Sequence, residues 1–207
     1  MANSTQQLSG LLLSLLGWIG SIITCALPTW RVSAFLGTDM MAAQTVTEGL
    51  FQTCVSDNAG RLQCKYYDSL LEISPGLQAG RGLVITSIFT AFFGLVAVLT
   101  GFRSSRFAED ENIKNRNTVI GGVTFVMAGV MLLIPVASSA NSTVCNFYNP
   151  LVPESLKREL GSAIIVGLFS FALELIGGSV LCSAGLSTNR DSDRERKGCS
   201  YPMKDYV

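Results

Sequence analysis

Two cysteines, Cys54 and Cys64, carry the clearest chemical signal in this 207-residue chain. They flank a predicted turn at 57–60 and lie in a polar stretch between two long apolar runs. On adjacent strands in an oxidising compartment, such a pair would form a disulfide that stabilises the fold by roughly 2.5–3 kcal/mol. Two free thiols or a metal pair are the alternatives. The chain has no histidine and no CxxC spacing, which argues against a metal site.

Catalytic chemistry has little support in the sequence. Histidine, the commonest general acid or base, is missing, and no nucleotide loop, metalloprotease motif or nucleophile elbow is present. Glu174 is the one charged residue inside the apolar runs, and it could serve an ion or proton relay. Because no second charge lies in these runs, a protonated or hydrogen-bonded glutamate facing other helices is favoured. We therefore expect no enzyme and no cofactor, and the balanced charge, 15 basic and 15 acidic residues, predicts no nucleic-acid partner.

Four apolar runs must position these residues. Only 14% of the chain is charged, whereas a soluble domain carries about a quarter. Each run reaches the roughly 20 residues that a helix needs to cross a bilayer, and together they predict membrane spans at 8–28, 82–102, 118–140 and 160–186. A cleaved signal peptide is the alternative for the first run, but the residues before it include no Lys or Arg. Abundant small residues in the spans predict a tight four-helix bundle.

The distribution of basic residues predicts the orientation. Four spans place both termini on one side of the membrane. The short segments dense in Lys and Arg are 103–117 and 187–207, so we expect them in the cytosol with residues 1–7. The loops 29–81 and 141–159 then face outward. Alternating and β-branched stretches at 30–33, 44–47, 52–55 and 61–66 predict strands in the first outer loop.

Several smaller features remain open. Cys145 is a third outward cysteine, which could be buried, free or paired between molecules. Cys25 and Cys182 are expected to pack within spans, and Cys182 and Cys199 are also candidates for acylation. Asn141 begins an outward glycosylation sequon close to the membrane. The chain ends in Tyr206 and Val207. A small apolar last residue with a free carboxylate is typical of chains that bind PDZ domains.

Together these features resemble the claudins, the four-span proteins of tight junctions. The residues that carry the resemblance extend over nearly the whole chain: Trp30, Gly49, Leu50, Cys54, Cys64, Arg81 and the terminal Tyr-Val. The family pattern is W…GLW…C…C, and here Phe51 replaces the second tryptophan, which keeps an aromatic side chain but loses the indole donor. The resemblance implies a membrane all-α, left-handed four-helix bundle with an extracellular antiparallel β-sheet formed by the two outer loops.

The resemblance also implies contacts between molecules. Leu70 stands where the family places an apolar knob, and Phe147, Tyr148 and Leu160 match the receiving pocket on the neighbouring molecule in the same membrane. Such head-to-tail contacts build open filaments. These apolar residues could instead pack within their own module. A second loop is similar to the one by which some claudins contact the opposing cell and bind a clostridial enterotoxin. It comprises Asn149, Pro150, Leu151, Val152 and Pro153.

Lys65 follows the second cysteine, where cation-pore claudins have an acidic residue. A fixed positive charge repels cations within a Debye length of about 8 Å, so we expect a barrier or weakly anion-favouring protein. The predicted partners are other claudins, PDZ scaffold proteins and the lipid bilayer. A related four-span regulatory subunit, of the peripheral-myelin or calcium-channel γ type, is the alternative, but the 149–153 loop and the terminal Tyr-Val favour a claudin.

Overall fold

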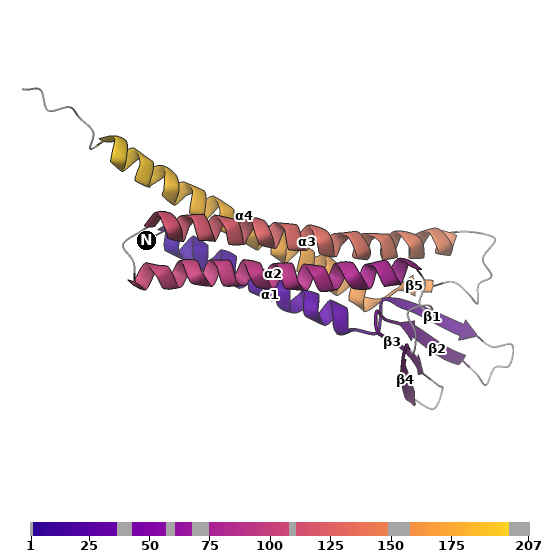
Figure 1. The fold of residues 1–207 in the computed structure, drawn as a ribbon. Helices are drawn as coiled ribbons and strands as arrows, with labels where there is room; N and C mark the ends of the chain where they lie inside the picture. The colour runs from indigo at the N-terminus through magenta and orange to yellow at the C-terminus, as the bar shows by residue number, and fades with distance from the viewer. Residues whose placement is uncertain are drawn as a thin grey trace, which may run out of the picture.

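The chain folds into four long helices with a small sheet at one end (Figure 1). The computed structural model describes residues 2–36, 43–56, 61–67, 75–107, 111–148 and 158–198. The helices are α1 (Ala2–Ala26), α2 (Pro75–Phe107), α3 (Glu111–Tyr148) and α4 (Ser162–Gly198). The strands are β1 (Arg31–Leu36), β2 (Ala43–Glu48), β3 (Gln52–Ser56), β4 (Leu62–Tyr66) and β5 (Arg158–Leu160).

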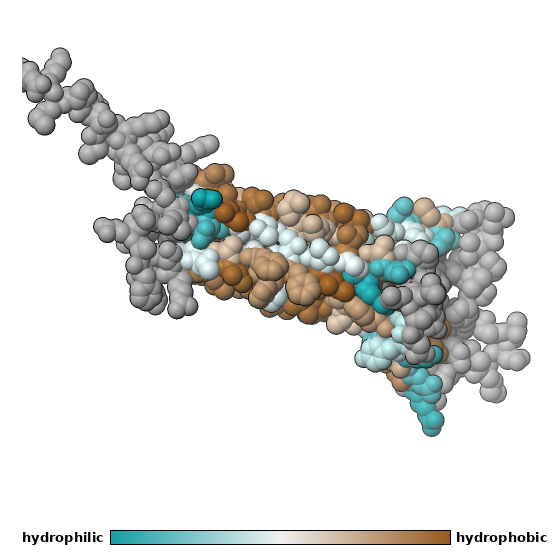
Figure 2. Space-filling model, in the orientation of Figure 1, coloured by the Kyte–Doolittle hydropathy of each residue, from teal (hydrophilic) through white to brown (hydrophobic). Residues whose placement is uncertain are grey.

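All four helices are long and apolar enough to cross a membrane, as the sequence predicted. The qualifying stretches are Thr5–Ala26, Gly76–Gly101, Asn115–Tyr148 and Ser162–Ser187. Figure 2 shows hydrophobic residues covering the middle of the bundle, with hydrophilic residues at its two ends. The start of α1 lies at the end of the bundle opposite the sheet, and α4 runs on past that same end (Figure 1).

Proline positions explain two of the helix ends. The Leu27 N–H still donates to the Ile23 carbonyl at 2.9 Å, and Pro28, which has no N–H, follows directly. Pro75 is the first residue of α2, where its missing N–H is not needed by the helix. At the other outer segment, α3 continues to Tyr148, and Leu160 lies in β5 before α4 begins at Ser162.

The helices approach one another closely at small residues. α2 packs mainly on α3, α1 on α4, and α3 on α4. A Cβ atom at Gly122 of α3 would lie 2.8 Å from the carbonyl oxygen of Gly178 in α4, and one at Gly178 would lie 2.7 Å from the Gly122 carbonyl oxygen. Only glycine allows this approach at both positions. Lipid supplies no hydrophobic force between helices, so this backbone packing stabilises the bundle.

The five strands form one antiparallel sheet in the order β4-β3-β2-β1-β5, which we call the outer sheet. Four strands come from the segment between α1 and α2. The fifth, β5, comes from the segment between α3 and α4 and pairs with β1. This confirms the expected sheet built from both outer loops. Within the described residues, β4 and β5 are its two edges.

Candidate functional site

The outer sheet is anchored in the helix bundle by two fully buried side chains. Trp30 has none of its surface exposed and Leu50 has 1%. Both pack in a cluster with residues from α2, α3 and α4: Leu77, Val84, Leu132, Val136, Ala163 and Ile164. Cys25 of α1 packs against this cluster. The indole N–H of Trp30 donates to the Thr24 carbonyl at 2.9 Å, and its backbone N–H donates to the Glu48 carbonyl at 2.9 Å. Burial of these side chains therefore joins the sheet to the bundle.

Two glycines allow the chain to close tightly around Trp30. A Cβ atom at Gly49 would lie 2.5 Å from the Pro28 Cα atom. A Cβ atom at Gly161 would lie 1.8 Å from the Thr29 carbonyl oxygen, and the Gly161 N–H donates to the Trp30 carbonyl at 3.3 Å. No side chain fits at either position without backbone movement. The first of these glycines belongs to the predicted motif, whereas the second was not singled out from the sequence.

Arg81 in the second turn of α2 holds the turn between β2 and β3. Its Nε donates to the Leu50 carbonyl at 2.8 Å, and its Nη2 donates to the same oxygen. Its guanidinium carbon lies 4.7 Å from the ring centroid of Phe51 and 5.8 Å from that of Tyr67. A cation over aromatic rings is attracted to their electron-rich faces. Phe51, although it lacks the indole donor, therefore supplies a ring for this contact.

The disulfide joins directly opposite residues of β3 and β4. Cys54 and Cys64 are register partners, with Cα atoms 4.0 Å apart and an S–S bond of 2.00 Å. Cys54 is buried, while every residue of β4 is exposed. Since β4 pairs only with β3 among the described strands, the disulfide fixes this edge strand to the rest of the sheet. The free cysteines in the described part of the chain are Cys25, Cys145 and Cys182.

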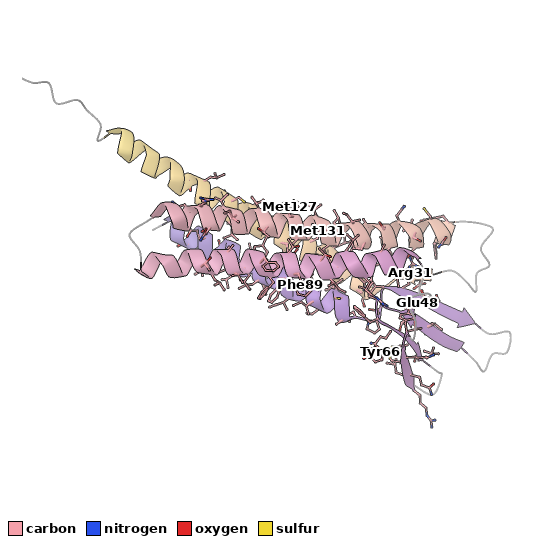
Figure 3. The ribbon with its side chains drawn as sticks, in the orientation of Figure 1. Arg31, Glu48, Tyr66, Phe89, Met127 and Met131 are labelled. Atoms are coloured by element: carbon pink, nitrogen blue, oxygen red, sulfur yellow. A yellow bond between two sulfur atoms is a disulfide. The ribbon has the colours of Figure 1, made fainter. Side chains whose placement is uncertain are left out.

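Lys65 lines an open hollow on one face of the β3–β4 hairpin. The hollow has a volume of about 420 Å³ and is lined by Thr53, Val55, Gln63, Cys64, Lys65, Tyr66 and Tyr67. Lys65 is exposed and pairs in register with Thr53. The Thr53 hydroxyl donates to the phenol oxygen of Tyr67 at 2.7 Å, which connects the floor of the hollow to the Arg81 contact. Figure 3 shows β4, with Tyr66, projecting away from the helices.

A groove lies between the end of α3 and β5. It has a volume of about 300 Å³, and its lining residues are Thr143, Val144, Phe147, Tyr148, Glu159 and Leu160. Phe147, Tyr148 and Leu160 are 45%, 79% and 47% exposed. The rings of Phe147 and Tyr148 meet edge to face, with centroids 5.7 Å apart. The three residues that the resemblance assigned to a receiving pocket thus lie together around one apolar groove.

Sequence reasoning missed a pair of oppositely charged residues at the base of the sheet, of which Arg31 is buried and Glu48 half-buried. Arg31 of β1 and Glu48 of β2 are register partners, and Arg31 is only 8% exposed. Figure 3 shows the two side by side where the outer sheet meets the bundle. On its other side Arg31 pairs in register with Leu160 of β5. The only available signal was their opposite charge, with Arg31 on one predicted strand and Glu48 directly after the next, and the register was needed to place them together.

Some of the predicted residues lie outside the described part of the chain. They are Leu70, the 149–153 loop, Cys199 and the terminal pair Tyr206 and Val207.

The described geometry defines a four-span membrane protein whose outer segments form a single disulfide-bridged sheet anchored in the bundle. A model of the PMP-22/EMP/MP20/Claudin family matches residues 4–181, and the chain belongs to this family. It is 44% identical to Claudin-3 of Homo sapiens, over 97% of this chain and 98% of that protein. It is 43% identical to Claudin-6 of Homo sapiens over the full length of both, and 41% identical to Claudin-4 of Bos taurus over 88% of this chain and 87% of that protein.

The family model by itself includes the peripheral-myelin group. Relatives that match along nearly the whole chain, such as Claudin-3 and Claudin-6 of Homo sapiens, are named claudins, which favours a claudin over a peripheral-myelin protein. The chain is a claudin, a multi-pass membrane protein of tight junctions, and the resemblance drawn from its motif residues is confirmed.

Proposed function

We propose that this claudin polymerises into tight-junction strands and controls the passage of ions and solutes between cells. It acts by position and charge and catalyses no reaction. The groove of six residues between α3 and β5 is the observation that carries the proposal, because it offers a concave apolar surface beside the outer sheet. A second copy in the same membrane supplies the side chain that enters it.

The direction of the contact follows from its two different surfaces. The groove lies at the β5 edge of the outer sheet, and Leu70, which we assign as the entering knob, follows β4 at the other edge in sequence. A contact between unlike surfaces repeats without closing, so copies extend into a filament. Among the described strands, the β5 edge beside the groove is then available to a neighbour. Exposed apolar side chains such as Tyr148 favour this use over packing within one molecule.

The orientation of the protein places the outer sheet between cells. The described parts of the two segments dense in Lys and Arg, 103–107 with 111–117 and 187–198, are at the bundle end opposite the sheet. The positive-inside rule assigns that end to the cytosol, with both termini. Tyr206 and Val207 would then be accessible to PDZ scaffold proteins by carboxylate capture. The loop 149–153 would face the opposing cell, where it could also bind a clostridial enterotoxin.

Lys65 makes the protein a barrier or a weakly anion-favouring path. It is exposed and lines the hollow of the hairpin. An ion passing along this face meets a positive charge within a Debye length of about 8 Å, which excludes cations more than anions.

Expression in cells that lack tight junctions tests the polymerisation. The wild type is expected to form continuous strands at cell contacts. Tyr148→Ala removes an exposed ring from the groove without disturbing the core, so strands should become sparse or absent while surface delivery persists. Leu62→Ala is the matched control, because Leu62 is 68% exposed on β4 and lines neither the groove nor the hollow.

A wild-type protein spread evenly over the surface would contradict the proposal and support a regulatory four-span subunit instead. Strands of Tyr148→Ala that match those of the wild type would remove the groove from the account.

A further inference from the structure

Glu174 has no role in the outer sheet or in polymerisation, yet it is fully buried. It lies about half-way along the candidate span Ser162–Ser187, and none of its surface is exposed. Neither carboxyl oxygen has a hydrogen-bond partner in the described part of the chain. A buried polar group without a partner is costly, and an ionised carboxylate in that position is far more costly than a neutral acid.

The side chain occupies the contact between three helices. A Cβ atom at Gly17 of α1 would lie 2.7 Å from the Glu174 Cγ atom and 2.9 Å from its backbone nitrogen. A Cβ atom at Gly129 of α3 would lie 3.5 Å from the Oε2 atom. The glycine at position 17 therefore allows α1 to approach the Glu174 side chain and backbone closely, and Gly129 lies within van der Waals distance of the carboxyl group. Water could reach the carboxyl only if α1, α3 and α4 moved apart.

The surrounding hydroxyl groups are directed elsewhere. Ser170, one turn before Glu174, donates to the Val166 carbonyl at 2.7 Å. On α1, Ser14 donates to the Gly10 carbonyl at 2.9 Å and Ser21 to the Trp18 carbonyl at 2.7 Å. These donors satisfy their own helices and are not available to stabilise a negative charge.

No charged group faces Glu174 from any packed helix. The stretches 8–27, 82–102, 118–140 and 160–186 contain no other Asp, Glu, Lys or Arg, and no His or Tyr. Their remaining titratable side chains are Cys25 and Cys182. Cys182 is eight residues from Glu174 on α4, and Cys25 is eight residues from Gly17 on α1, which places each about 12 Å away along the helix axis.

We propose that Glu174 is an intramembrane proton-binding site whose protonated form allows α1, α3 and α4 to pack together. The bound proton keeps the carboxyl neutral inside the glycine-lined contact. Loss of the proton creates a charge that has no partner there, and the helices separate to admit water. The ligand of this site is a proton.

The sign of the resulting pH dependence follows from proton counting. Only the neutral acid suits the buried contact, whereas an ionised Glu174 can be solvated in the unfolded chain. Stability should therefore fall as pH rises. The folding equilibrium constant should decrease by up to about tenfold per pH unit.

The test compares purified full-length wild type with Glu174→Gln in detergent, unfolded from about pH 5 to about pH 9. The amide has the shape of the neutral acid but does not ionise, so Glu174→Gln should remain stable where the wild type loses stability. Hydrogen exchange in α1 and α4, compared at each pH, should be faster in the wild type than in the variant only at high pH. Glu111→Gln, which removes a carboxyl group at the start of α3, should follow the wild type.

Infrared absorption gives a second test that does not depend on a variant folding. The wild type at neutral pH should show the carbonyl stretch of a protonated carboxylic acid that is slow to exchange with heavy water. Carboxylate bands alone, or the same pH profile for wild type and Glu174→Gln, would overturn the proposal. Neither result depends on strand formation, so the proposed function is tested separately.

Discussion

Reversing the charge at Lys65 should change the ion selectivity of a junction made from this protein. Lys65 is exposed in the hollow between β3 and β4. A unit charge about 6 Å from a passing ion in water interacts with it by a little over RT, and salt screening with a Debye length of about 8 Å leaves about half of RT. Lys65→Asp changes the fixed charge by two units, which favours sodium and disfavours chloride by equal amounts.

The effect on sodium and the effect on chloride multiply in the sodium-to-chloride permeability ratio. We expect the sodium-to-chloride ratio to rise by roughly five- to tenfold in Lys65→Asp and by roughly threefold in Lys65→Gln, because the second change removes one unit of charge instead of two. The graded response distinguishes charge from a change of shape. The assay is the dilution potential across an epithelial monolayer that expresses each variant at an equal level.

Arg61→Asp provides the matched control. Arg61 is also exposed, next to the start of β4, but it does not line the hollow. Its reversal carries the same charge change and should alter the ratio less than that of Lys65. Strand formation and transepithelial resistance confirm that each variant is assembled. An unchanged ratio for Lys65→Asp in normally assembled strands would refute the assigned role, as would equal effects of the two reversals.

Two further predictions concern the stability of the outer sheet. The double variant Cys54→Ala/Cys64→Ala should lower the free energy of unfolding by about 3 kcal/mol, because the bridge closes a short loop and fixes an edge strand. Denaturant titration of detergent-purified protein measures this change. A midpoint equal to that of the wild type would show that the bridge contributes nothing. Arg81→Met should cost about 2 kcal/mol, because it removes both hydrogen bonds to the Leu50 carbonyl and the contact with the Phe51 ring. Arg81→Lys should recover part of this loss in thermal unfolding, whereas equal stability of all three proteins would exclude the clamp.

Features that depend on local pattern were predictable from the sequence. The length of the apolar runs indicated four helices, since crossing a bilayer requires about 20 apolar residues. Alternation and β-branched residues indicated the strands, and the ends of β1 to β4 lie within three residues of the expected ranges. The disulfide followed from two cysteines on adjacent arms of a hairpin, because residues opposite each other in a ladder are close enough to bridge.

Features that depend on register and helix rotation were not predictable. Gly161 lay inside the expected fourth span, and its sequence neighbours give no sign that its Cα faces the Thr29 carbonyl. The opposition of Arg31 and Glu48 is set by the β1–β2 register, which the connecting segment alone does not specify. The position of Glu174 opposite Gly17 depends on the rotation of α1 against α4. Periodicity cannot supply that rotation when a helix is apolar on every face.

The position of the charge at Lys65 is set by contacts that begin in the membrane. Arg81, on α2, binds the Leu50 carbonyl, and the adjacent Phe51 carbonyl accepts a bond from the Tyr67 N–H at 3.4 Å. Tyr67 also contacts Arg81 and accepts the Thr53 hydroxyl, and Thr53 pairs with Lys65. Arg81 therefore links α2 to the turn between β2 and β3 and, through Tyr67 and Thr53, to both strands of the hairpin. Changes that move the outer end of α2 should therefore alter selectivity even when they leave every residue of the hollow in place.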